Sequence, residues 1–188
     1  MASIPNIPAT HTAIIQHEGG KLRVTHGVPV PSLLPGWLLV RNIAVALNPC
    51  DFKMAARFPT PGLKDGVDFA GTVVAVGEGV KEFAVGDGVF GCVPSNKQDD
   101  PESGSFGQYV KVEEIYALRI PPDTSCEQAL AFAPACVSTA ALALHEGLKM
   151  PVTPDEVDYY PDRKAGETVL VYGGSSSVGL LAIQLLKL

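Results

Sequence analysis

Apolar and polar residues alternate in short runs over most of the chain before Pro121, and turn residues separate these runs. A period of two is typical of β-strands that bury one face. Glu18-Gly19-Gly20 lies between the first two runs and predicts a hairpin, whereas Asn48-Pro49 ends a later, longer run. The predicted strands are residues 12–16, 22–25, 37–47, 68–76, 85–91, 105–112 and 117–120. We therefore expect an all-β, barrel-like unit in this part of the chain.

After Pro122 the spacing of apolar residues becomes helical. Residues 124–127 read Thr-Ser-Cys-Glu, a capping-box pattern that predicts a short helix over 128–132. Pro134 can occupy the first turn of a second helix, and Gly147 predicts its end. Residues 150–165 contain three prolines and several acidic residues, so they predict a polar connector.

A different pattern closes the sequence. Residues 168–172 are β-branched and apolar and predict a buried parallel strand, a Gly/Ser turn follows, and an amphipathic helix starts at about Val178. In such a unit, backbone N–H groups and a helix N-terminus meet a pyrophosphate. The turn has glycine at 173 and 179, but Ser176 replaces the middle glycine of a dinucleotide-binding turn. An ordinary strand-to-helix turn is the alternative interpretation.

The composition excludes several classes of partner. The formal net charge is −6 and Lys and Arg do not cluster, which argues against nucleic acid. The cysteines at 50, 92, 126 and 136 have no paired spacing, so they predict neither a disulfide framework nor a zinc set. The first residues lack a signal-peptide pattern, and no run approaches the roughly 20 apolar residues of a membrane span. We expect a cytoplasmic protein without nucleic-acid or membrane contacts.

The order of motifs resembles the medium-chain dehydrogenase/reductase superfamily. The resemblance is carried by residues 47–53 (Leu-Asn-Pro-Cys-Asp-Phe-Lys), the glycine-rich segments 66–77, 85–91 and 104–110, and the turn 173–179. It implies an α/β protein in which an N-terminal GroES-like β-barrel domain precedes a Rossmann nucleotide-binding domain. We assign residues 1–149 to the GroES-like catalytic and substrate domain and 150–166 to a linker. Residues 167–188 would be the first strand, turn and helix of the Rossmann domain, which would be truncated after them.

Zinc-dependent members of that superfamily have a cysteine near the position of Asn48 and Gly-His-Glu where this chain has Gly66-Val67-Asp68. They often add a lobe with four closely spaced cysteines near residues 92–105, where this chain has only Cys92. A soft-ligand site cannot be built from Asp68 and one thiol. We therefore expect no metal and place the chain in the zinc-free branch.

Within that branch, the proline-bearing linker and the spelling Tyr-Gly-Gly-Ser-Ser-Ser at 172–177 resemble fungal trans-acting enoyl reductases of lovastatin-type polyketide synthases and related toxin-cluster reductases. The resemblance implies hydride transfer from NADPH to an enoyl thioester on an acyl carrier protein, with a polyketide synthase as partner. One alternative is a zinc-free quinone or alkenal oxidoreductase acting on free small molecules. Another is a non-catalytic truncated product.

The resemblance also implies three groups of site residues. The wall on the nicotinamide side of NADPH would be Cys50, Asp51, Phe52 and Lys53. The wall of the acyl pocket would be Thr139, Ala140, Ala141, Leu142, Ala143, Leu144, His145 and Glu146. The phosphates would contact Gly173, Gly174, Ser175, Ser176, Ser177 and Val178.

Lys53 and Thr139 are the catalytic candidates among these residues, because a fixed charge and a hydroxyl could stabilise a developing enolate. Structural roles remain as alternatives. Lys53 would then be a solvated lysine after an Asn48-Pro49 turn, and Asp51 would cap a segment that begins with Phe52. Thr139 would be a helix cap, and the three serines would form a plain polar turn.

Overall fold

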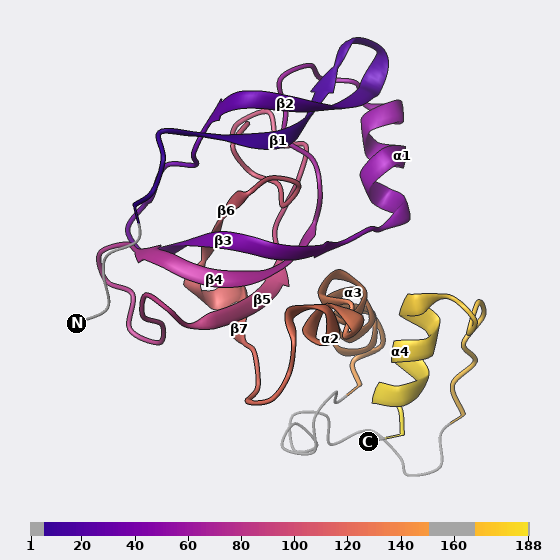
Figure 1. Cartoon of the computed structure of the whole chain (residues 1–188). Helices are drawn as coiled ribbons and strands as arrows, with labels where there is room; N and C mark the ends of the chain where they lie inside the picture. Colours follow the sequence, from indigo (N-terminus) through magenta and orange to yellow (C-terminus); the bar gives the residue numbers. More distant parts are fainter. Residues whose placement is uncertain (1–5, 151–167, 188) are drawn as a thin grey trace. The chain divides into compact units, whose positions relative to one another are not determined.

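The computed structural model describes residues 6–150 and 168–187, which divide into two compact units between Phe132 and Ala133 (Figure 1). The first unit contains a two-stranded hairpin, a five-stranded sheet and helices α1 and α2. The second contains α3, the π-helical turn η3 and α4. Apart from Met150, the predicted linker lies outside the described residues.

The hairpin forms where the Glu18-Gly-Gly20 turn predicts it. Strand β1 (Thr10–His17) pairs antiparallel with β2 (Lys21–Pro29), and the one-turn helix η1 (Glu18–Gly20) joins them. Gly19 and Gly20 both have positive φ, 68° and 71°, a conformation that costs glycine little. An added Cβ at Gly20 would also lie 2.9 Å from the Ala55 carbonyl carbon, so the tight turn packs directly against α1 (Pro49–Arg57).

The second sheet has the order β6-β3-β4-β5-β7, and all its neighbours pair antiparallel. Its strands are β3 (Trp37–Ala46), β4 (Asp68–Val76), β5 (Gly88–Cys92), β6 (Tyr109–Glu113) and β7 (Ala117–Arg119), with the one-turn helix η2 (Glu114–Tyr116) between the last two. The prediction of alternating strands in this region is confirmed. Strands β5 and β6 begin later than predicted, because Gly86 turns at a φ of 101° and Gly107 donates its N–H to Ser105 O within a loop.

The core lies on both faces of β4, because neighbouring side chains along this strand point in opposite directions. Phe69 and Val73 belong to a fully buried cluster on one face. Ala70, on the other face, packs with Phe90, Ala129 and the remaining side chains of a smaller cluster under helix α2 (Cys126–Ala131). The sheet is therefore a rigid support for the loops that leave its strand ends.

The predicted capping box is shifted by one residue. Ser125, not Thr124, is the N-cap of α2: its hydroxyl accepts the Gln128 N–H at 3.2 Å, and the Gln128 side chain accepts the Ser125 N–H at 2.8 Å. The helix therefore starts at Cys126, earlier than the predicted 128–132. Because glutamine can accept at this position as glutamate can, Thr124 with Glu127 and Ser125 with Gln128 both fit the motif. Only the backbone geometry selects between these two pairs.

Helix α3 (Pro134–Leu142) begins at Pro134 as predicted and continues into η3 (Ala143–Gly147). By length and composition alone, the stretch Cys126–Gly147 is apolar enough to cross a membrane. Ala133 interrupts this stretch with a left-handed φ of 50°, so α2 and α3 are separate helices.

The prediction of a strand at 168–172 is wrong for this structure. Residues 168–171 are in no strand, and the side chains of Leu170 and Tyr172 are 89% and 99% exposed. A parallel strand is held by hydrogen bonds to neighbouring strands, and the described part of the second unit contains none. The turn and helix α4 (Ser177–Leu185) do form, because their bonds are local.

Candidate functional site

The start of α1 is built by side chains that bond to one another. Pro49 occupies the first helical position, and the Asn48 N–H donates to Asp51 Oδ2 at 2.7 Å. The Asn48 amide also donates to Asp68 Oδ2 at 2.9 Å, and Asp68 is fully buried at the start of β4. Asp51 thus has the expected capping role, but it caps a helix that begins at Pro49 and not at Phe52.

Burial raises the pKa of Asp51 to about 6, against the opposing effect of the hydrogen bond from Asn48, and the Asp65 and Asp68 carboxylates add to the rise. An unfolded aspartate titrates near pH ~3.9. The folded state therefore holds this proton more tightly than the unfolded state. The stability that protonated Asp51 contributes is present below about pH 4 and is lost as the pH rises through about 6.

Replacing Asp51 with asparagine removes the charge and keeps an acceptor for the Asn48 N–H. Relative to wild type, the unfolding free energy of Asp51→Asn should rise by roughly 2 kcal/mol as the pH is raised from 4 to 7. Urea unfolding at both pH values measures this difference. Asp99→Asn is the matched control, because the Asp99 side chain is 81% exposed. An Asp51→Asn difference that does not change with pH would contradict the assignment.

Three more predicted cofactor residues lie on α1 beside this cap. Cys50, Phe52 and Lys53 are all exposed, and 59% of Phe52 is accessible. Partial burial raises the pKa of the Cys50 thiol, and the neighbouring Asp51 carboxylate adds to this effect, so Cys50 is not an activated nucleophile. The α1 surface therefore offers a thiol, an aromatic ring and an ammonium group to a ligand.

The predicted acyl wall lies on α3 and η3. Thr139 is exposed, and its hydroxyl donates to Ala135 O at 2.7 Å, one turn earlier in the helix. Such a back-bond is the ordinary state of a helical threonine, so this hydroxyl must rotate before it can donate to a ligand. Ala140 and Leu144 are buried, whereas Leu142 and Ala143 are exposed, so the segment does not present one continuous face.

Residues Ala143–Gly147 form a π-helical turn, which the sequence pattern did not predict. Such turns widen a helix locally and are frequent at functional sites. His145 Nε2 lies 3.8 Å from Glu146 Oε1, and Lys149 Nζ lies 3.2 Å from Glu146 Oε2. The only sequence signal for this departure is Gly147, which could equally have ended an α-helix.

The glycine turn is organised around Ser176. Its hydroxyl accepts the Gly179 N–H at 3.1 Å and donates to Gly173 O at 2.8 Å, which makes it the N-cap of α4. In this conformation the hydroxyl proton is used by Gly173 O, so a phosphate contact through this hydroxyl would require it to rotate, and the predicted contact of Ser176 stays a prediction. Ser175 and Ser177 are exposed.

This turn fits a dinucleotide phosphate. Gly173 has a φ of 88°, and a Cβ on Gly179 would lie 2.8 Å from the Gly174 Cα, so helix and turn are in backbone contact. Only glycine allows that approach, which is the role of the third glycine in dinucleotide-binding turns. The first-turn N–H groups of Ser177 and Val178 are donors that an α-helix cannot satisfy by itself.

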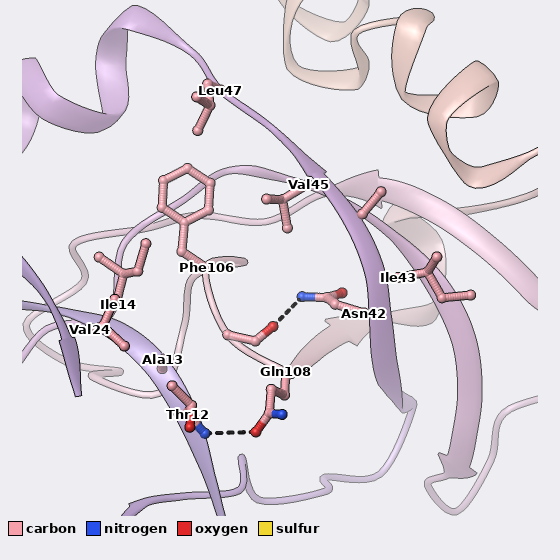
Figure 2. Close-up of a pocket in the computed structure, with 12 residues that line it drawn as sticks. Thr12, Ala13, Ile14, Val24, Asn42, Ile43, Val45, Leu47, Phe106 and Gln108 are labelled. Carbon is pink, nitrogen blue, oxygen red and sulfur yellow. Dashed lines mark hydrogen bonds between the residues drawn. The ribbon is translucent and has the colours of Figure 1, made fainter. Parts of the chain in front are cut away.

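An apolar groove of about 390 Å³ lies in the first unit between β1, β3 and the loop before β6 (Figure 2). Ile14, Val45, Leu47 and Phe106 face this space. The Asn42 amide donates to Ser105 O and Gly107 O at 2.7 and 2.8 Å, which fixes the loop that carries Phe106. The sequence pattern did not predict the groove, since the groove joins residues far apart in the chain.

Within residues 6–150 and 168–187, no three His, Cys, Asp or Glu side chains form a metal-binding group. We expect purified protein to contain no stoichiometric zinc, because Asn48 and Val67 occupy the ligand positions and Asn48 is bonded to Asp68. Elemental analysis after dialysis measures the metal content. One tightly bound zinc per chain would refute the prediction.

Comparisons with known proteins agree with this architecture. Residues 34–122 match the family described as "Alcohol dehydrogenase GroES-like domain". The enoyl reductase cheB of Chaetomium globosum is 46% identical over 186 residues, which are 97% of this chain and 48% of that protein. The trans-enoyl reductase RAP2 of Pyricularia oryzae is 44% identical over 182 residues, 97% of this chain and 50% of that protein. The chain spans about half the length of these relatives.

Solved structures show the same likeness. An alcohol dehydrogenase superfamily protein from Novosphingobium aromaticivorans superposes with a TM-score of 0.71 at 30% identity, over 94% of this chain and 50% of that one. The mycobacterial protein Rv1454c, solved in complex with NADPH, superposes with a TM-score of 0.64 at 27% identity, over 92% of this chain and 48% of that one. The N-terminal GroES-like architecture expected from the motifs is confirmed.

Proposed function

This chain belongs to the medium-chain dehydrogenase/reductase superfamily, and on that premise we propose that it is part of an NADPH-dependent enoyl reductase. The enzyme would act in trans on α,β-unsaturated polyketide thioesters presented by a carrier protein of a polyketide synthase. The observation that carries the proposal is the 46% and 44% identity, over 97% of the chain, to fungal proteins named enoyl and trans-enoyl reductases. We also propose the division into a catalytic domain (1–149), a linker (150–166) and the start of a nucleotide domain (167–188).

The superfamily implies a nicotinamide cofactor, and the neighbour solved with NADPH favours that form. When bound, NADPH supplies the hydride for the β-carbon of the enoyl group. We assign the phosphate contacts to the exposed serines 175 and 177 and to the N–H groups of Ser177 and Val178. Ser176 has a positioning role, because its two hydrogen bonds hold the turn and helix together.

Two catalytic roles are assigned separately, one to Lys53 on α1 in the first unit and one to Thr139 on α3 in the second. Reduction of the β-carbon leaves negative charge on the thioester oxygen, which an ammonium group or a hydroxyl can stabilise before the α-carbon is protonated. Lys53 is exposed and has a flexible stem, so it can turn toward this charge. Thr139 can contribute once its proton leaves Ala135 O.

A comparison of substrates tests the function. The sample is a protein in which this sequence continues into a complete nucleotide-binding domain. The measurement is kcat/KM for one enone presented on a carrier protein and as a free small molecule. We expect a strong preference for the carrier-bound form. Equal use of both forms would end the polyketide proposal and favour the quinone or alkenal alternative.

Substitutions test the residue assignments in the same protein. We expect Lys53→Ala and Thr139→Val each to lower kcat roughly tenfold to a hundredfold, since each removes one donor to the developing charge. Their melting temperatures should stay near wild type, because both side chains are exposed. Lys81→Ala, also exposed, is the matched control. Unchanged kcat in both variants would leave these residues with structural roles only.

A further inference from the structure

A second, smaller cavity of about 230 Å³ lies in the first unit, away from the residues assigned to the reaction. Ile15 and Val28 form part of its apolar walls, and His11, Lys64 and Glu102 provide its polar groups. Burial of polar groups is costly unless each finds a hydrogen-bond partner. The hydrogen bonds of these three side chains therefore show what the cavity lacks.

His11 lines this cavity, and one nitrogen of its ring is an unused donor. The Tyr109 N–H donates to His11 Nδ1 at 3.2 Å, and burial, together with the Lys64 charge, lowers the pKa of His11 to about 4. The ring is therefore neutral, with its proton on Nε2. His11 is only 4% exposed, and Nε2 has no hydrogen-bond partner among the residues that the structure describes.

Lys64 brings further donors. Lys64 is only 1% exposed, and its Nζ donates to Tyr109 O at 3.3 Å. The backbone of Tyr109 therefore binds both side chains, His11 through its N–H and Lys64 through its carbonyl. An ammonium group has three N–H donors. Across the described segments 6–150 and 168–187, Lys64 forms no ion pair, although burial lowers its pKa only to about 8 and it is still mostly charged at neutral pH.

Other groups already use most of the acceptor positions of Glu102. One of its oxygens accepts the Ser32 N–H at 3.0 Å and Lys111 Nζ at 3.1 Å, and the other accepts the Ser32 hydroxyl at 3.1 Å. Lys111 is in addition paired with Asp100 at 2.8 Å. The Glu102 and Asp100 carboxylates both bond to Lys111; they also favour the charged form of Lys64 and raise its pKa, but within the described residues neither forms an ion pair with it.

We propose that this cavity is a binding site for a small monocarboxylate, whose oxygens accept from Lys64 Nζ and His11 Nε2 while its short hydrocarbon chain contacts Ile15 and Val28. A carboxylate offers about four acceptor positions, which matches an excess of donors better than one water molecule does. The volume and the apolar walls favour a ligand of several heavy atoms over a single inorganic ion. The site is separate from the proposed reductase chemistry.

An NMR titration of the 188-residue chain with sodium butyrate at neutral pH tests this proposal. We expect saturable shifts at the His11 ring and the Lys64 side chain, and none with n-butanol, which has the same chain without the charge. Lys64→Met should weaken butyrate binding about tenfold or more, since it removes a charged donor. Lys81→Met, at an exposed position, is the matched control and should bind as wild type.

His11→Phe provides a second variant, because it removes the Nε2 donor while keeping a ring of similar shape; amide spectra confirm that each variant is folded. If Lys64→Met does not fold, weaker butyrate binding by His11→Phe supports the site instead. No saturable shift in wild type, or equal affinity in wild type and a folded variant, overturns the proposal and leaves the cavity to water.

Discussion

A polypeptide of residues 1–188 is expected to bind NADPH weakly and to show no turnover. A doubly wound nucleotide domain needs several parallel strands with helices on both faces. The described part of the second unit supplies helices α3 and α4 with the turn η3, and Leu170 and Tyr172 are almost fully exposed beside the glycine turn. At about 25 cal/mol per Å² of apolar surface, leaving such residues unburied forfeits roughly several kcal/mol, comparable to a domain's net stability.

Isothermal titration with NADPH measures the affinity, and hydrogen exchange over residues 168–187 reports whether the turn and α4 are protected. We expect fast exchange in this segment while the strands of the first unit remain protected. The control is a longer protein in which the same residues continue into a complete nucleotide domain. Micromolar affinity and strong protection in a monomer of residues 1–188 would contradict the prediction.

Gly66→Ala is expected to lower the unfolding free energy by roughly 3 kcal/mol and to displace the loop that carries Phe106. Gly66 has a φ of 90°, where a Cβ costs about 1–2 kcal/mol of backbone strain. The new Cβ would also collide with the Phe106 ring and lie 2.6 Å from Ser105 Oγ, and overpacking of this kind adds about 1–3 kcal/mol.

Gly79→Ala separates the two causes. Gly79 has a similar φ of 84°, but an added Cβ there meets nothing within 4 Å, so only the strain remains. We expect this control to lose roughly 1 kcal/mol in urea unfolding. Equal losses in the two variants would mean that the Phe106 loop moves aside freely, and that the groove of Figure 2 is not rigid.

The motifs predicted the Gly/Ser turn that carries part of the proposed site, but they did not predict the hydrogen bonds of the site residues. The turn after Gly173 leads into a helix, as the sequence predicted, whereas Asn48-Pro49, predicted only as the end of a strand run, also begins α1. The hydroxyls of Ser176 and Thr139 are occupied by backbone groups three or four residues away, which the same residue types allow in any helix. Residue type at a turn indicates which bonds are possible, whereas backbone geometry selects among them.

Local periodicity and turn chemistry by themselves determined the hairpin of the first unit, the approximate positions of its strands along the chain, and the start of α3 in the second unit. These features depend on neighbours within a few residues, so the sequence carries them directly. Tertiary structure alone decided the rest. Residues 168–172 have strand-forming side chains but form no strand, because a strand needs a partner.

His11 and Lys64 are brought together only by the tertiary structure. They lie 98 and 45 positions from Tyr109, whose N–H and carbonyl hold them at one cavity. An isolated histidine and a lysine in the sequence carry no sign of that arrangement. It exists because folding removes both side chains from water and leaves their donors unequally satisfied, and burial is a property of the assembled chain.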